Sequence, residues 1–174
     1  MPMLDAFIPE GALEPDAEAT LVRELTDLLM RHEGVDPTNE KARDVSLVFL
    51  HRPKIYVAGA PATSLRYRFV ASAIEGLYDD ERRAAIVRDV TAAVARAEGT
   101  ELEDVAPRVW VFPLEVPDGR WGGRGVIVRL GDFIGRIMGP KARADAEDLF
   151  AERRRTEALA VIEEAHGAAV SRTS

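Results

Sequence analysis

Apolar and polar positions near the start of the chain follow an order that predicts a strand, a helix and a second strand. The first strand is predicted over Met3–Ile8. Asp16 is expected to cap the helix and Gly34 to end it. Within the helix, apolar residues recur at spacings of three and four, which is typical of one buried face: Leu21, Val22, Leu25, Leu28 and Leu29. The β-branched and apolar run Val45–Leu50 predicts the second strand.

The same order of signals returns in the next part of the chain. Leu65–Ala71 predicts a third strand, and either Asp79 or Asp80 is expected to cap the following helix. Gly99 is expected to end that helix. Its apolar stripe consists of Ile86, Val87, Val90 and Val94. Arg108–Phe112 predicts a closing strand that ends at Pro113.

An internal repeat explains this similarity. At an offset of 65 residues, Glu10–Gly34 aligns with Glu75–Gly99 without a gap, and both segments begin and end with Glu-Gly. Nine of the 25 aligned positions are identical. We interpret the two segments as copies of one β-α-β unit. Because a helix crosses between the two strands of each copy, those strands are expected to be parallel.

The expected fold class is therefore α+β. Two tandem β-α-β repeats, about 2–56 and about 64–125, are predicted to form a four-stranded mixed sheet with two helices on one face. The duplicated domain is assigned to 1–136 and a C-terminal helical extension to 137–174. Since the helices cover only one face, the other apolar face needs another layer or another subunit. Oligomerisation is thus predicted before any function is considered.

Two further elements are predicted after the second repeat. Val126–Leu130 reads as a short edge strand that follows a glycine-rich loop. Pro140–His166 reads as a long helix, rich in alanine and charge, that Gly167 stops.

Composition and charge narrow the classes of function. The 174 residues include 23 Lys and Arg against 30 Asp and Glu, a net charge of −7 that disfavours binding to nucleic acid. No cysteine is present, which excludes disulfides, thiol nucleophiles and iron–sulfur clusters. The three histidines lack metal-ligand spacing, so neither metal nor cofactor is expected. With no membrane-spanning run and no signal peptide, the chain is expected to be soluble and cytoplasmic, with no membrane partner.

The strongest candidate for chemistry is Pro2. Removal of Met1 would leave Pro2 with a free secondary amine at the start of the first strand. An apolar pocket and nearby arginines both disfavour the charged form of such an amine, so they would bring it toward the range in which a general base works at neutral pH. Pro2 is therefore the predicted catalytic residue.

The combination of these features resembles the tautomerase superfamily, which includes 4-oxalocrotonate tautomerase-like and macrophage migration inhibitory factor-like proteins. The resemblance covers about residues 2–134. It rests on Pro2 before a strand, the Glu10-Gly11 turn, the β-α-β repeat and the loop Gly119-Arg120-Trp121-Gly122-Gly123. It implies a tautomerase/MIF-like fold, a catalytic amino-terminal proline and, for the duplicated type, a homotrimer.

Within the superfamily, the most similar group is malonate semialdehyde decarboxylase. The segments that resemble it are His51-Arg52-Pro53, the spaced residues Glu115, Asp118 and Trp121, and Gly131-Asp132. The chain also departs from its relatives. Ala12 stands where single-unit tautomerases often carry arginine, and the region 74–77 lacks the arginine pair of the decarboxylases and dehalogenases. Tyr67 occupies the repeat position of Pro2, so each chain is expected to have one catalytic end.

Candidate substrate-binding residues fall into three groups. Lys41 and Arg43 precede the second strand, where members of the family often place a substrate-binding cation. Arg66 and Arg68 share one face of the third strand and are either solvated charges or a clamp for a carboxylate. Three aromatic residues are candidates for pocket walls, with core packing or an interface as the alternative: Trp110, Phe112 and Trp121.

The function expected from the sequence is keto-enol tautomerisation of a small 2-oxo or enol acid by a cofactor-independent isomerase. Pro2 would act as general acid and base while the cations hold the acidic substrate. The alternatives are decarboxylation or hydration of a small oxo acid, as in a lyase, and a catalytically silent trimeric scaffold or binding protein.

Overall fold

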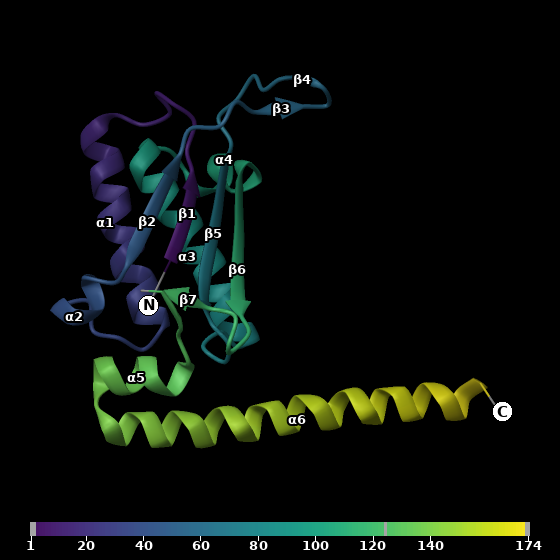
Figure 1. Cartoon of the computed structure of the whole chain (residues 1–174). Helices are drawn as coiled ribbons and strands as arrows, with labels where there is room; N and C mark the ends of the chain where they lie inside the picture. The colour runs from purple at the N-terminus through teal and green to yellow at the C-terminus, as the bar shows by residue number, and fades with distance from the viewer. Residues whose placement is uncertain (1–2, 124, 173–174) are drawn as a thin grey trace. The chain divides into compact units, whose positions relative to one another are not determined.

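The computed structural model describes residues 3–123 and 125–172. The chain divides into two compact units after Pro117. The first unit contains the first repeat and the second repeat as far as Pro117, and the second unit contains the glycine-rich loop, predicted as the end of the second repeat, and the C-terminal helices (Figure 1). The boundary predicted at residue 136 lies inside helix α5, Leu130–Met138.

The first unit follows the predicted order of strands and helices in both repeats, with short additions. Its elements are β1 Met3–Phe7, α1 Pro15–His32, α2 Glu40–Arg43, β2 Leu47–His51, β3 Tyr56–Val57, β4 Ala60–Pro61, β5 Tyr67–Ile74, α3 Asp80–Glu98, α4 Leu102–Val105, a 3₁₀ turn Ala106–Arg108 and β6 Val109–Val116. The pattern did not predict the hairpin of β3 and β4, whose strands have only two residues each. A two-residue strand is too short to show the alternation by which strands are predicted.

The sheet has the strand order β2-β1-β5-β6. Strand β2 is parallel to β1 and β6 is parallel to β5, whereas β1 and β5 are antiparallel. The predicted four-stranded mixed sheet is thus confirmed. The central antiparallel pair places the two repeats in opposite directions, so the start of β1 and the start of β5 lie at opposite ends of the sheet (Figure 1).

The core lies between the sheet and helices α1 and α3, which cover the same face (Figure 1). Alternation along the strands produces this arrangement, because neighbouring residues of a strand point to opposite faces. On β1, Leu4 and Ala6 are fully buried, and on β5 Tyr67 and Phe69 are buried in the same way. The helices contribute most of the stripe predicted from their spacing, including Leu21, Leu25, Leu28, Leu29, Ile86, Val90 and Val94. Val87 was wrongly predicted in this stripe, because it is 38% exposed.

The opposite face of the sheet exposes large apolar side chains. Leu47 and Phe49 on β2 lie there with Trp110, Phe112 and Leu114 on β6. Trp110 is 61% exposed, an unusual value for a tryptophan in a strand. This open face agrees with the expectation that the two helices leave half of the sheet uncovered. A large exposed apolar patch marks an interaction surface.

The helix ends differ in part from the prediction. Asp16 lies within the first turn of α1, because the helix begins at Pro15 after Glu14. Proline suits that position because the first turn leaves its N–H groups without helical acceptors. Of the two predicted caps for α3, Asp79 and Asp80, the structure has Asp79. Its carboxylate accepts a hydrogen bond from the Arg82 N–H at 2.7 Å. Gly99 ends this helix with a φ of 66°.

The prediction that Pro113 ends its strand is wrong, because β6 continues to Val116. The Val116 carbonyl accepts a hydrogen bond from the Glu75 N–H, so the polar groups of Val116 face the sheet. Backbone N–H and C=O groups of successive residues in a strand point to alternate sides. Pro113 is three residues before Val116, so its backbone groups point to the outer edge of the sheet. A proline there removes no hydrogen bond of the sheet, and an edge strand is where proline is tolerated.

The second unit consists of a short hairpin and two helices. Strands β7, Gly122–Gly123, and β8, Val126–Ile127, form the hairpin, so the predicted strand over Val126–Leu130 is shorter than expected. Helix α6 spans Pro140–Arg172 and continues through Gly167, which was wrongly predicted to stop it. One glycine inside a helix costs only about 1 kcal/mol relative to alanine.

The cap of α3 can be tested with neighbouring acids. Asp79→Ala is expected to lower the free energy of unfolding by about 1 kcal/mol, because the Arg82 N–H loses its acceptor. Asp80→Ala is the matched control, since that carboxylate is fully exposed and contacts the Arg83 side chain rather than the backbone cap of the helix. Urea denaturation measures both. An equal loss in the two variants would show that charge, rather than the cap, stabilises this end.

Candidate functional site

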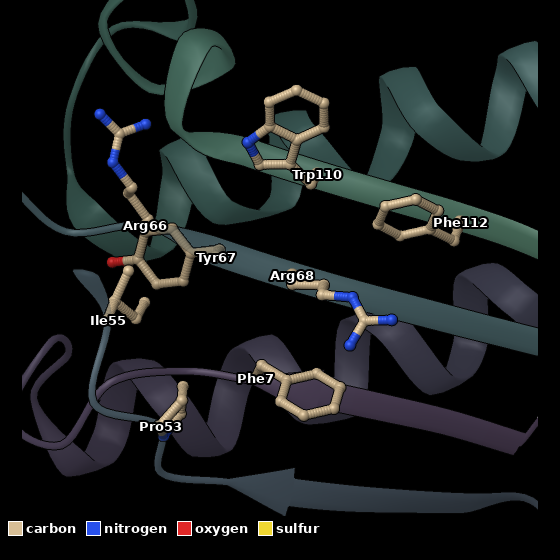
Figure 2. A pocket seen from close by; sticks show the side chains of 8 residues that line it. All are labelled: Phe7, Pro53, Ile55, Arg66, Tyr67, Arg68, Trp110 and Phe112. Carbon is tan, nitrogen blue, oxygen red and sulfur yellow. The ribbon is translucent and has the colours of Figure 1, made fainter. Parts of the chain in front are cut away.

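A hollow on the open face lies at the start of β5, and we call it the β5 pocket. Its volume is about 450 Å³. Figure 2 shows Arg68 of β5 between Phe112 of β6 and Phe7 of β1, with Pro53 and Ile55 of the segment after β2 farther along the pocket and Arg66, which directly precedes β5, pointing to another side. The lining residues are Phe7, Pro53, Ile55, Arg66, Tyr67, Arg68, Trp110 and Phe112. The structure thus brings together four of the predicted site residues: Arg66, Arg68, Trp110 and Phe112.

Arg68 lies between two aromatic rings in this pocket. Its Cζ atom is 4.9 Å from the centre of the Phe7 ring and 5.2 Å from that of Phe112. The sheet register explains the contact with Phe7, because Arg68 pairs with Phe7. On its other side Arg68 pairs with Trp110, and Phe112 lies two residues farther along β6. Cation–π attraction favours such a position for a guanidinium group. Among the described residues, no carboxylate forms an ion pair with Arg68.

Arg66 extends from the same strand end toward a different side of the pocket (Figure 2). Its side chain is partly buried, and its Nε atom is buried without a hydrogen-bond partner. A buried donor without a partner carries a desolvation cost, so it favours any ligand that brings an acceptor. Whether Arg66 and Arg68 are surface charges or a clamp for a carboxylate stays a prediction.

Tyr67 is held from the helix side of the sheet. Its hydroxyl donates a hydrogen bond to Oε1 of Glu98 at 2.6 Å, and Arg108 binds both oxygens of the same carboxylate at 2.9 and 2.6 Å. The Arg108 guanidinium lowers the pKa of Glu98 despite the burial of that carboxyl. Burial and the Glu98 charge raise the pKa of Tyr67 far above neutrality. Tyr67 therefore stays a neutral donor and offers no base to the pocket.

The first repeat has a different arrangement at the equivalent positions. An offset of 65 residues relates Glu33 to Glu98, and Arg43 precedes β2 as Arg108 precedes β6. Glu33 is almost fully buried, and burial raises the pKa of its carboxyl. Arg43 donates instead to Asp27 at 2.6 Å and to the Pro37 carbonyl at 2.9 Å. The environments of the two strand starts have thus diverged.

Pro2 lies outside the described residues, so its predicted role stays a prediction. The first described residue of β1 is Met3, and Phe7 in the β5 pocket ends that strand. Four residue steps of about 3.3 Å separate them, or roughly 13 Å. Within one chain, the β5 pocket and the start of β1 are therefore at opposite ends of the strand. That the pocket residues hold a substrate for Pro2 also stays a prediction.

Lys41 and Arg43 lie toward the other end of the sheet. Both belong to α2, which precedes β2, and the first residue of β2 pairs with Met3. Arg43 is engaged by Asp27. Lys41 is exposed and forms no ion pair within the described part of the chain. Of the two predicted cations, Lys41 is the one whose charge remains available to a ligand.

Trp121 belongs to the second unit. It directly precedes β7 and is only 6% exposed, and its carbonyl accepts a hydrogen bond from the Val128 N–H at 2.8 Å. The tryptophan of this glycine-rich loop is thus a buried residue rather than an exposed one. Its predicted part in a substrate pocket stays a prediction.

Sequence reasoning missed Phe7, Pro53, Ile55 and Tyr67 as pocket residues. Phe7 carried a usable signal, because antiparallel pairing of the two first strands would place it beside Arg68. Pro53 and Ile55 carried none, since they reach the pocket from an irregular segment. His51 binds Asp5 at 2.6 Å and stacks on Phe7.

Over residues 3–123 and 125–172, no cluster of three or more His, Asp or Glu side chains is arranged to hold a metal ion. None of the helices described is both long enough and apolar enough to cross a membrane.

Comparison with known proteins gives a match of fold rather than of sequence. No family model and no curated protein matches the sequence. Among solved structures, a fused 4-OT described as an asymmetric trimer is 18% identical, with a TM-score of 0.58; the match covers 72% of this chain and 94% of that one. Pt0534 inactivated by 2-oxo-3-pentynoate is 21% identical, with the same TM-score and the same coverage of both chains.

The macrophage migration inhibitory factor of Toxoplasma gondii is also similar. It is 12% identical, with a TM-score of 0.57, and the match covers 72% of this chain and 99% of that one. All three structures belong to the tautomerase superfamily. The fold is therefore that of the tautomerase superfamily, in the form of two fused β-α-β units, as expected from the sequence.

The Glu98 contacts predict a pH-dependent contribution to stability. Glu98→Gln is expected to lower the free energy of unfolding by about 2 kcal/mol at pH 7, because Arg108 loses a buried ionic partner. Since the pKa of Glu98 is lowered in the folded state, its contribution is complete above the ordinary value of 4.5. It is lost as the pH falls through the lower folded value.

Chemical denaturation at several pH values measures this effect. The difference between the wild type and Glu98→Gln should shrink below pH 4.5. Glu103→Gln is the matched control, because Glu103 is an exposed acid on α4. A constant difference across this range would contradict the ionic origin of the effect.

Proposed function

We propose that the chain is a cytoplasmic, cofactor-independent tautomerase in which Pro2 is the general acid and base. The observation that carries the proposal is the position of Pro2, which directly precedes β1, an inner strand of a tautomerase-superfamily fold. Structures with this fold include fused 4-OT and a protein inactivated by a reactive 2-oxo acid. These similarities support an acidic 2-oxo or enol substrate.

In the proposed reaction, Pro2 with a neutral secondary amine removes a proton from the enol hydroxyl of the substrate. The electron pair of the O–H bond forms the carbonyl, and the double bond shifts toward the distal carbon. The prolinium ion then returns its proton to that carbon, so the amine is restored and no co-reactant is consumed. A cation beside the substrate carboxylate and developing enolate lowers the barrier. Lys41 is our candidate for this cation, since Arg43 is paired with Asp27.

The open apolar face supports a homotrimer. Its five exposed apolar side chains come from the two outer strands, β2 and β6, so a second surface can cover the sheet from edge to edge. The helices cover only the opposite face. Fused 4-OT, with the same arrangement of units, is described as a trimer. We therefore propose that copies of this chain cover one another's open face.

The proposed base can be tested by selective labelling. At pH 6.5, a limiting amount of an amine-acylating reagent is expected to modify Pro2 before the lysines, because a neutral amine is the reactive form. The lysines are an internal control: the chain has only Lys41, Lys54 and Lys141. Peptide mass spectrometry locates the label and reports whether Met1 has been removed. 2-Oxo-3-pentynoate should add to the same amine, with a mass increase of one whole reagent molecule.

Activity toward small enol acids should fall by about 10²- to 10⁴-fold in Pro2→Ala, the usual contribution of a general base. Lys54→Ala is the matched control and should keep full activity. Retained Met1, or full activity in Pro2→Ala, would contradict the mechanism and favour the silent scaffold. Release of carbon dioxide or formation of a hydrated product from a small oxo acid would instead favour the decarboxylase or hydratase alternative.

The proposed assembly can be tested by introducing an aspartate either on the open face of the sheet or on the outer side of a helix. Leu114→Asp is expected to shift the sedimentation coefficient from trimer toward monomer, because Leu114 is 49% exposed on the open face. Val87→Asp is the matched control, since Val87 is 38% exposed on helix α3. Sedimentation velocity at micromolar concentration measures both. A monomeric wild type, or equal dissociation in both variants, would contradict the proposed interface.

A further inference from the structure

Glu33 is a buried acid on the helix side of the sheet, and the proposed reaction does not use it. It directly follows helix α1, its N–H donates to the Leu29 carbonyl at 3.0 Å, and only 7% of the residue is exposed. A buried carboxylate is costly unless hydrogen-bond donors or a positive charge compensate it. The groups around Glu33 therefore decide what this carboxyl can do.

The topology brings Glu33 to the end of the sheet where β1 begins (Figure 1). Helix α1 connects β1 with its parallel neighbour β2, so it runs back along the sheet to the start of β1. Strand β5 finishes at the same end, because Ser72 pairs with Met3. Leu4 of β1 points to the helix side, and strand alternation gives position 2 the same side. Pro2 itself lies outside the described residues, so this is an expectation from the pattern.

The second repeat shows what a glutamate in this position contacts. An offset of 65 residues relates Glu33 to Glu98 and Pro2 to Tyr67. The Glu98 carboxylate accepts a hydrogen bond from the Tyr67 hydroxyl at 2.6 Å, so it faces the residue that begins β5. Because strand and helix follow one another in the same order in both repeats, we expect the carboxyl of Glu33 to face Pro2 in the same way.

The positive charge near the two glutamates has different sources. Arg108, which precedes β6, binds both oxygens of Glu98. Arg43, which precedes β2, donates to Asp27 instead. A Pro2 amine that has taken up a proton would bring a positive charge to Glu33 at the moment when the reaction forms it.

Tyr78 is a second polar group beside Glu33. Burial raises the pKa of Tyr78 far above neutrality, and the charges of Glu33 and Glu115 raise it further, against the opposing effect of Arg82. Tyr78 therefore stays protonated over the range in which an amine titrates. Helices α1, α2 and α3 contribute further titratable or charged groups around the end of α1: His32, Lys41, Arg43 and Asp89.

We propose that Glu33 is a positioning residue for Pro2, a role that rests on the proposed function. Its carboxylate accepts a hydrogen bond from the N–H of the Pro2 amine and thereby directs the lone pair toward the substrate. After Pro2 has taken the enol proton, the same carboxylate stabilises the prolinium ion. No proton passes to Glu33, so the proton balance of the reaction is unchanged. An apolar site alone would make the amine a weak base, and the carboxylate restores part of its basicity.

The test is the pH profile of Pro2 acylation in the full chain, followed by peptide mass spectrometry from about pH 5 to about pH 9. Glu33→Gln is expected to lower the midpoint of this profile by at least about one pH unit, because the amine loses a nearby negative charge. Glu33→Asp should fall between the wild type and Glu33→Gln, since it keeps the charge on a shorter side chain. A merely structural role of Glu33 would lower the free energy of unfolding and leave the midpoint where it is.

Turnover of small enol acids gives a second measurement. In Glu33→Gln, kcat is expected to fall by at least about tenfold with KM unchanged, because the carboxylate acts on Pro2 and does not touch the substrate. Glu40→Gln is the matched control: it removes the same charge from an exposed acid on α2 and should leave midpoint and kcat unchanged. Urea denaturation shows that each variant is folded at the pH used. An unchanged midpoint in either Glu33 variant, or an equal shift in Glu40→Gln, would overturn the proposal.

This inference and the proposed function fail in different ways. If Pro2 is acylated selectively and Pro2→Ala loses activity while Glu33→Gln matches the wild type, the proposed function stands and the role of Glu33 is wrong. If Pro2 of the wild type is unreactive, or Met1 is retained, both are wrong.

Discussion

The antiparallel pairing of β1 with β5 is the constraint on which the rest of the structure depends. It joins two parallel β-α-β units in opposite directions, so both helices fall on one face and the other face remains apolar. It also separates the two strand starts by the length of the sheet. The register places Phe7 beside Arg68, and this single contact brings a residue of the first repeat into the pocket of the second.

Most of the fold was predictable because it depends on periodic signals. Alternation in β1 and the helical stripe of Leu21, Leu25 and Leu28 gave the elements, and the repeat gave their order. The strand ends were not predictable, since whether Pro113 interrupts a strand depends on which way its missing N–H would face. In the candidate site, Arg68 of β5, Arg66 just before it and the aromatic residues of β6 could be selected from strand alternation. Their partners could not, because segments such as that of Ile55 follow no period.

The two repeats have kept a common scaffold while their charges have changed. In the first, Arg52 after β2 binds the Glu18 carboxylate with two hydrogen bonds. In the second, the polarity is reversed: Glu115 on β6 accepts from Arg83, the repeat counterpart of Glu18. Each contact ties the end of a strand to the start of the preceding helix. The contact between strand end and helix start is thus present in both repeats with opposite charge arrangements. The residues around the starts of β1 and β5, in contrast, differ between the repeats.

Pro113 also determines how the sheet can grow. An outer strand normally presents a row of N–H and C=O groups on which another chain can form a further strand. At Pro113 that row lacks a donor, so open-ended addition of strands along β6 is disfavoured. Association through the apolar face has no such obstacle. The molecule is thereby biased toward closed assemblies of fixed size and away from fibres.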